Sequence, residues 1–212
     1  MWSRLAHELR ARGHEVFTPS LTGVGERSHL ASAAVNLSTH ILDVVNVLAY
    51  ERLERVVLVG HSYGGMVVTG VADRAAARLM ALVYLDAFVP QHGQAAVDLL
   101  PSAMRERLPH DDWRVPPLPP QAQGMTDPAE IAWGEGRRGA QPLGTLTEKL
   151  SLQGHYRGPR RYILCSGYAP STFRQFGERL RHDPAWRYDE LPTHHYPQVS
   201  MPRETAQLLE TT

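Results

Sequence analysis

The 212-residue sequence predicts a single domain of the α/β class, in which a mainly parallel sheet carries helices on both faces. Short runs of aliphatic residues recur along the chain, and each has the length of a strand buried on both faces. Segments with apolar residues at helical spacing separate these runs. After one run lies a serine between glycines, a pattern typical of a strand, a sharp turn and a helix.

The predicted elements follow this alternation from end to end, and we expect one domain over 1–212. The helix over 38–52 has Asn36 or Ser38 available as its N-cap. In chain order the elements are helix 2–12, strand 15–19, loop 22–29, helix 38–52, strand 56–60, helix 65–77, strand 79–85, strand 161–165, helix 171–181, strand 186–191 and helix 202–210.

The serine pattern occupies 60–64, as Gly-His-Ser-Tyr-Gly. We interpret it as a nucleophile elbow, which holds Ser62 at the tip of a strained turn with its hydroxyl clear of the sheet. Gly60 and Gly64 would let strand and helix approach without a Cβ clash. Because a helix N-terminus favours developing negative charge, the Tyr63 N–H is the natural first oxyanion donor. The alternative is a glycine-rich turn with an idle serine.

Residues 91–157 interrupt the alternation and are rich in Pro, Gln and Gly. An excursion of this length inside one domain is typical of a lid or binding segment, and short helices are expected near 95–107 and 144–150. A loosely ordered insertion is the alternative. The segment's large apolar residues, which suit either a pocket or the interior of a lid, include Trp113, Met125 and Trp133.

The charge balance excludes several classes of partner. Lys and Arg number 22 and so do Asp and Glu, so no basic excess attracts nucleic acid or an anionic membrane. No segment has the pattern of a signal peptide or the length of a membrane span, so we expect a cytoplasmic protein. The single cysteine, Cys165, lies in an apolar run and is interpreted as a buried small hydrophobe.

An activated serine needs a base, and the chain order Ser, acid, His of this architecture places that base after the last strand. His194 and His195 both lie there, and we favour His195, although position alone does not decide which ring faces Ser62. We assign surface or local structural roles to the other early histidines, His7, His14, His29, His40 and His61.

The best candidate for the acid is Asp86, at the carboxyl end of the strand that follows the elbow, where sites of open α/β sheets form. The turn after the penultimate strand, 166–170, is another expected place but holds no carboxylate. Asp183 and Asp189 fit the geometry less well. In the alternative, Asp86 merely hydrogen-bonds its own turn.

The sequence contains no motif typical of metal, nucleotide or dinucleotide binding. The chain has no Cys or His pair at metal-ligand spacing, no Walker loop and no dinucleotide fingerprint at a first strand. We therefore expect no metal and no cofactor. The glycine-bearing loop at 22–25 does not open a helix, so it is interpreted as a loop near the pocket.

Two motifs, at 60–65 and 84–90, together with the histidine loop, resemble the α/β-hydrolase fold family. More narrowly, the chain resembles the esterase and hydroxynitrile lyase-like branch that includes salicylate-type esterases, along essentially its whole length. The resemblance implies Ser62 as nucleophile, His195 as base and ester hydrolysis as the reaction. Many relatives have Gly-His where this chain has two histidines, which favours His195.

The chain departs from that family at two places. Relatives that are lyases have a lysine after the catalytic histidine, whereas this chain has Tyr196, which leaves cyanohydrin cleavage a minor alternative. Relatives also begin with strands before the first helix, and one of these leads into a loop with the second oxyanion donor. This chain begins in that helix, so we expect N-terminal strands to be missing and the natural protein to extend upstream. The missing central strand would lie between 15–19 and 56–60.

The sequence thus predicts a serine esterase that cleaves a small carboxylic ester through an acyl-enzyme, with Ser62, His195 and Asp86 as its triad. A second hypothesis is a catalytically impaired, ligand-binding protein of the same fold. Ligand stabilisation without ester turnover would distinguish it from an esterase, and a direct assay of cyanohydrin cleavage would identify a lyase.

Overall fold

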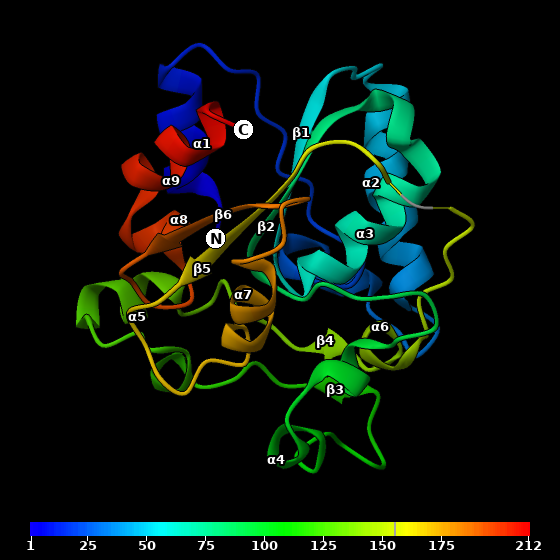
Figure 1. The fold of residues 1–212 in the computed structure, drawn as a ribbon. Helices are drawn as coiled ribbons and strands as arrows, with labels where there is room; N and C mark the ends of the chain where they lie inside the picture. Colours follow the sequence, from blue (N-terminus) through cyan, green and yellow to red (C-terminus); the bar gives the residue numbers. More distant parts are fainter. Residues whose placement is uncertain (155) are drawn as a thin grey trace.

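A four-stranded parallel sheet forms the centre of the computed structural model, which describes residues 1–154 and 156–212 (Figure 1). Its strand order is β1-β2-β5-β6. The strands are β1 Val56–Ser62, β2 Leu79–Ala87, β5 Arg160–Cys165 and β6 Arg187–Leu191. Two further strands, β3 Arg114–Val115 and β4 Gln141–Pro142, pair antiparallel in a small separate sheet. The predicted parallel α/β architecture is confirmed.

Helices connect the strands of the main sheet. The α-helices are α1 Ser3–Ala11, α2 Leu37–Tyr50, α3 Gly64–Ala75, α4 Ser102–Arg105, α5 Pro128–Gly134, α6 Gly144–Thr147, α7 Arg174–Leu180, α8 Pro197–Ser200 and α9 Pro202–Glu210. The 3₁₀ helices are η1 Gly25–Leu30, η2 Ala76–Arg78, η3 Ala96–Leu99 and η4 Pro120–Gln123. No helix in the part of the chain that the structure describes could cross a membrane by its length and hydropathy.

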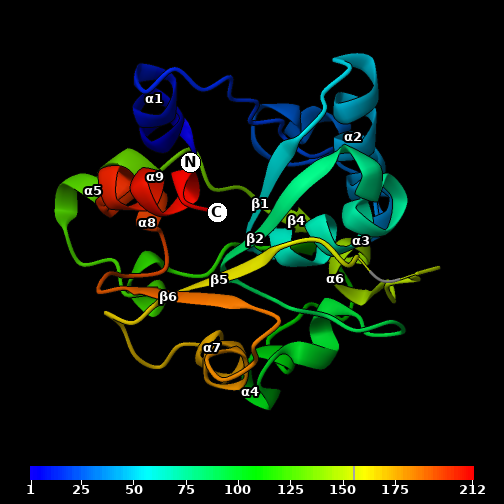
Figure 2. The same ribbon diagram turned by 45° about the horizontal axis from the view of Figure 1, so that its top comes forward.

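Strand β2 is buried on both faces from Ala81 to Ala87, as its continuous apolar run predicts. In β2, Leu82 and Tyr84 face a core that includes residues of α2, α3 and α7. Val83 and Leu85, which alternate with them, face a second core with Leu5 of α1 and residues of α9. Figure 2 shows these two groups of helices on opposite sides of the sheet.

The start of α2 distinguishes between the two predicted caps. The Asn36 side chain accepts a hydrogen bond from the Thr39 N–H at 3.0 Å, which makes Asn36 the N-cap. The Ser38 hydroxyl instead donates to Glu148 at 2.7 Å, and this bond ties α2 to the segment just beyond α6. An N-cap satisfies N–H groups that have no partner within the helix, so Asn36 fixes where α2 begins.

The predicted strand over 15–19 is wrong, because these residues have no strand structure and are mostly exposed. Val16, Phe17 and Thr18 are residues that strands favour, but a strand also needs a neighbouring strand to pair with its backbone N–H and C=O groups. Within the described residues β1 forms its ladder with β2 and is one edge of the main sheet. The side chain of Phe17 is 40% exposed as a result.

The predicted insertion over 91–157 consists of short elements, apart from residue 155, which lies outside the described residues. The expected helices near 95–107 and 144–150 are present in part as η3, α4 and α6, whereas α5 was not predicted. Met125 is fully buried against Tyr196 and Val199, and Trp133 packs against the same cluster. These two large apolar residues therefore form part of an interior rather than an open pocket wall.

A buried arginine joins β5, β6 and the end of α9. Arg161 is 0% exposed, and its Nε donates to Asp189 Oδ2 at 2.7 Å. Its Nη1 donates to the Thr211 and Thr212 hydroxyls, each at 3.0 Å. A buried cation needs such partners, because losing them leaves a desolvated charge uncompensated.

Asp189→Asn is therefore expected to lower the free energy of unfolding by about 2 kcal/mol, because the buried guanidinium loses its counter-charge. Urea unfolding monitored by circular dichroism measures the change. Asp111→Asn, at an exposed position of the insertion, is the matched control and should change stability little. Equal effects of the two substitutions would contradict the structural role given to Arg161.

Candidate active site

The site begins at the turn between β1 and α3, where Ser62 has a φ of 56°. This left-handed conformation is costly for a residue with a Cβ and is typical of functional positions held by their surroundings. The predicted strained turn is thus present. A Cβ on Gly60 would lie 2.6 Å from the Gly64 carbonyl oxygen, so strand and helix do approach closely there.

The prediction that Gly64 also permits this approach is wrong, and the other glycine at a close approach is Gly65. A Cβ on Gly64 would meet open space, whereas one on Gly65 would overlap the Phe88 carbonyl oxygen. Gly65 lies in the first turn of α3, on the side that packs against the residue after β2. The close contact is therefore between α3 and the segment that follows Asp86.

The hydroxyl of Ser62 lies at one end of a chain of hydrogen bonds. His195 Nε2 is 2.9 Å from Ser62 Oγ, and His195 Nδ1 is 2.6 Å from Asp86 Oδ2. Asp86 is 0% exposed and His195 2% exposed, while Ser62 is only partly buried. The structure thus brings together three side chains that lie at the ends of β1 and β2 and after β6.

Asp86 is held from several sides at the carboxyl end of β2. Its backbone has a φ of 44°, and its Oδ1 accepts the Cys165 N–H at 3.1 Å. Its Oδ2 accepts the Tyr168 hydroxyl at 2.8 Å in addition to His195. Each carboxylate oxygen therefore has at least one hydrogen-bond donor, as a buried polar group requires.

The other candidate acids have different partners. Asp189 pairs with Arg161, and Asp183 Oδ1 accepts the Ala185 N–H at 2.9 Å in the turn after α7. Neither is hydrogen-bonded to His195. Among these three candidates, Asp86 at the carboxyl end of β2 is therefore the acid that contacts His195.

The two neighbouring histidines point to different partners. His194 Nε2 is 2.8 Å from Glu130 of α5, and its Nδ1 accepts the Tyr196 N–H at 3.1 Å. His194 therefore links the histidine loop to the insertion, and His195 is the ring that reaches Ser62. The loop is also held by the His195 N–H, which donates to the Gln123 carbonyl at 3.1 Å.

Two residues beside the imidazole were not singled out by the sequence. The Phe173 ring stacks on His195 with centroids 4.8 Å apart and an interplanar angle of 3°. Tyr168 lies in the turn after β5, the place where an acid was sought and not found. The position of this turn could have pointed to Tyr168, because a phenol hydroxyl there can reach the Asp86 carboxylate.

His61 and His40 have structural positions around the elbow. His61 Nε2 is 2.6 Å from the His195 carbonyl oxygen, and the two rings are 4.5 Å apart. His40 is 1% exposed, with Nε2 2.8 Å from the Thr22 carbonyl and Nδ1 3.1 Å from the Tyr63 hydroxyl. His40, in α2, therefore links Thr22 of the loop at 22–29 to Tyr63, the residue that follows Ser62.

Burial, and secondarily the neighbouring His195, lower the pKa of His61 well below its usual value of 6.5. Burial also lowers the pKa of His40. Both rings are thus kept neutral in the folded protein, whereas in the unfolded chain they bind protons near pH 6.5. Cys165 is buried as predicted, and its burial, with the nearby Asp86 charge, raises the pKa of its thiol well above the usual range.

The free energy of unfolding is therefore expected to fall as the pH drops below about 6.5, because the unfolded chain takes up protons that the folded chain does not. Each such histidine contributes up to about 1.4 kcal/mol per pH unit. Urea unfolding at about pH 7.5 and about pH 5.5 measures the slope. His61→Gln keeps a donor to the His195 carbonyl but cannot titrate, so its slope should be smaller. An identical slope would count against a buried neutral His61.

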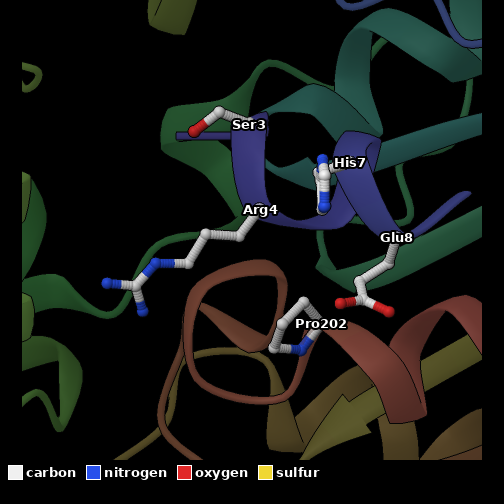
Figure 3. Close-up of a pocket in the computed structure, with 5 residues that line it drawn as sticks. All are labelled: Ser3, Arg4, His7, Glu8 and Pro202. Carbon is white, nitrogen blue, oxygen red and sulfur yellow. The ribbon is translucent and has the colours of Figure 1, made fainter. Parts of the chain in front are cut away.

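Two hollows lie elsewhere on the described surface. One of 380 Å³ lies between α1 and the start of α9, lined by Ser3, Arg4, His7, Glu8 and Pro202 (Figure 3). Another of 630 Å³ lies among α3, β2 and α7 and includes Tyr84, Arg179 and Trp186. Ser62 lines neither of them. Within the described residues, no group of His, Cys, Asp and Glu side chains has the arrangement of a metal site.

The comparisons with known proteins agree with this architecture. Residues 1–208 match the model of the alpha/beta hydrolase family. A carbendazim hydrolyzing esterase from Nocardioides sp. is 41% identical over 96% of this chain and 90% of its own length. Salicylic acid-binding protein 2 from Nicotiana tabacum is 28% identical over 53% of this chain and 43% of its own.

Solved structures share the fold. An extracellular alpha/beta-hydrolase from a Paenibacillus species superposes with a TM-score of 0.84 at 22% identity, covering 99% of this chain and 92% of the other. That protein is described as sharing structural and functional homology with tobacco Salicylic Acid Binding Protein 2. These matches confirm the resemblance that the sequence motifs indicated. The chain belongs to the alpha/beta hydrolase family, of which it is an esterase-type member.

Proposed function

We propose that the protein hydrolyses small carboxylic esters with Ser62 as nucleophile, His195 as general base and acid, and Asp86 as the group that orients the imidazole. The observation that carries the proposal is the unbroken path of hydrogen bonds from Asp86 Oδ2 through both nitrogens of His195 to Ser62 Oγ, at 2.6 and 2.9 Å. A serine hydroxyl is a weak nucleophile until an adjacent base takes its proton.

The reaction proceeds in two halves. Ser62 Oγ attacks the ester carbonyl carbon while His195 Nε2 takes the hydroxyl proton, and the resulting imidazolium is stabilised by the Asp86 carboxylate. Collapse of the tetrahedral intermediate breaks the ester C–O bond, and His195 returns the proton to the leaving alcohol. Water then attacks the acyl-enzyme, with His195 as base, and Ser62 regains its proton as the carboxylic acid leaves.

The Tyr63 N–H is proposed as a donor to the oxyanion of both intermediates. Tyr63 precedes Gly64, the first residue of α3, so its N–H lies at a helix end where such groups have no intrahelical partner. The dipole of the twelve-residue helix adds positive potential at that end. A donor of this kind contributes on the order of 100-fold to the rate when it is aimed at developing charge.

The candidate substrates are small esters, and carbendazim belongs among the first to be assayed. The relative with 41% identity is named for the hydrolysis of carbendazim and covers nearly the whole chain. Aryl, alkyl and lactone esters complete the assay set.

Rapid mixing with an activated aryl ester, p-nitrophenyl acetate, tests the acyl-enzyme step. We expect a burst of nitrophenol of about one equivalent per chain, followed by slower turnover, because acylation then outpaces deacylation. If no burst and no hydrolysis occur with any ester, while ligands still raise the melting temperature, a binding protein of this fold is the better description. Direct assay of cyanohydrin cleavage excludes or identifies the lyase.

A further inference from the structure

We propose that Tyr168 is a positioning residue of this site: its hydroxyl fixes the Asp86 carboxylate, which in turn holds His195 in the orientation that activates Ser62. The inference rests on the proposed function. It concerns a residue outside the triad, in the turn that follows the penultimate strand of the sheet.

The first argument is the geometry around Asp86 Oδ2. This single oxygen lies 2.8 Å from the Tyr168 hydroxyl and 2.6 Å from His195 Nδ1, and the hydroxyl is 3.3 Å from the same nitrogen. An ionised carboxylate oxygen can accept two donors at once. Rotation of the carboxylate away from His195 would break the Tyr168 bond too, so the phenol opposes that rotation.

The second argument is that the Tyr168 hydroxyl is itself held. Ser171 Oγ donates to the Tyr168 oxygen at 3.1 Å, which leaves the phenolic proton for Asp86. Ser171 Oγ also accepts the Phe173 N–H at 3.2 Å, and the Phe173 ring stacks on His195. One short segment after β5 therefore contacts both the carboxylate and the imidazole.

The opposite side of Tyr168 is closed by Gly124, which ends η4 with a φ of 78°. A Cβ at this position would overlap Tyr168 Cβ and would lie 3.1 Å from His194 Cβ. Only a glycine provides both this backbone conformation and this approach. The insertion thus packs against the phenol and limits its movement.

The third argument is electrostatic. Burial, together with the Asp86 charge, raises the pKa of the Tyr168 hydroxyl far above its usual value, so it remains a proton donor throughout the range in which an esterase is assayed. The other ionisable side chains around the imidazole are His61, which is kept neutral, and Asp86 and Tyr196, whose ring lies 5.1 Å from that of His195. Within the described residues, Tyr168 is the side chain besides His195 that hydrogen-bonds to the Asp86 carboxylate.

Removing the Tyr168 hydroxyl is expected to shift the pH dependence of activity in one direction. Without it, the Asp86 carboxylate keeps the Cys165 N–H and His195 as donors, so its negative charge is less neutralised and holds the imidazolium more strongly. The proton must then be removed at higher pH before the ring can act as base. The acid-side midpoint of the activity profile therefore moves upward.

The test compares Tyr168→Phe with the parent protein in the hydrolysis of p-nitrophenyl acetate. We expect kcat to fall about 10-fold with KM nearly unchanged, since a hydrogen bond to a charged group is lost away from the substrate. The acid-side midpoint of kcat/KM should rise by about half a pH unit or more. An unchanged kcat and midpoint would overturn the proposal.

Tyr188→Phe is the matched control. It removes another tyrosine hydroxyl that donates to a carboxylate, Glu190 at 2.6 Å on the exposed part of β6, and should leave kcat and the pH profile unchanged. Should Tyr168→Phe fail to fold, Ser171→Ala takes its place, with a smaller fall in kcat and the same direction of pH shift expected. No shift in that variant would equally overturn the proposal.

A spectroscopic measurement separates this proposal from the proposed function. A strong hydrogen bond between His195 Nδ1–H and Asp86 gives a far-downfield proton resonance, which requires no substrate. We expect Tyr168→Phe to move or broaden this resonance, and Tyr188→Phe to leave it unchanged. If Ser62→Ala retained ester turnover, the proposed function would fail, while this resonance would still decide the role of Tyr168.

Discussion

Ser62→Ala is expected to lower kcat/KM for ester hydrolysis by roughly 10⁵-fold, to the level supported by the oxyanion site and substrate binding alone. The reason is the proposed covalent step: without Oγ there is no atom 2.9 Å from His195 Nε2 to form the acyl-enzyme. The steady-state rate with an activated aryl ester, corrected for spontaneous hydrolysis, measures the effect.

The fold should survive this substitution. The φ of 56° at position 62 strains alanine and serine to a similar degree, so the melting temperature should change little. Ser62→Gly removes the hydroxyl and also the strained Cβ, and should be inactive yet somewhat more stable than the parent. Ser102→Ala, at an exposed position in α4, is the control and should keep full activity. Substantial turnover in both Ser62 variants would mean that another group is the nucleophile.

Asp86→Asn is expected to lower kcat by about 10³- to 10⁴-fold. Asparagine preserves the size of the side chain and tolerates the left-handed backbone, so the fold should remain. Its amide can present an N–H group to His195 Nδ1, which favours the wrong tautomer, and it does not stabilise the imidazolium that forms during the reaction.

The comparison with Asp183→Asn makes this measurement specific. Asp183 follows α7 and was another candidate for the acid in the sequence analysis. In the structure its carboxylate accepts a backbone N–H of its own turn. Its replacement should leave kcat within about twofold. If Asp86→Asn kept a tenth or more of the activity with an intact fold, the orienting role would belong to another group.

The sequence predicted the parts of the site that local patterning controls. Strand β1 begins with a continuous aliphatic run and β2 is mostly apolar, and such runs are typical of strands covered on both faces of a sheet. Once parallel strands are inferred, their carboxyl ends meet at one edge, which is why the pattern of residues is enough to place Ser62 and Asp86 together.

The remaining features depend on contacts between distant residues. The direction of His194 is set by Glu130, 64 positions away, and that of His195 by Asp86, 109 positions away. Residues 15–19 have the composition of a strand but no ladder, since pairing is a property of the neighbour as much as of the segment. α3 packs closely against Phe88, the residue after β2, and only a Cβ at Gly65 would clash with it. A Cβ at Gly64 would meet open space.

Labelling with a serine-directed fluorophosphonate, followed by peptide mapping, tests directly whether Ser62 is the activated nucleophile. We expect a single modified residue, Ser62, and labelling that is lost in Ser62→Ala and much slower in His195→Ala, because the reagent reacts with an activated serine. A folded protein that leaves Ser62 unlabelled, or that labels it equally fast without His195, would contradict the proposed mechanism.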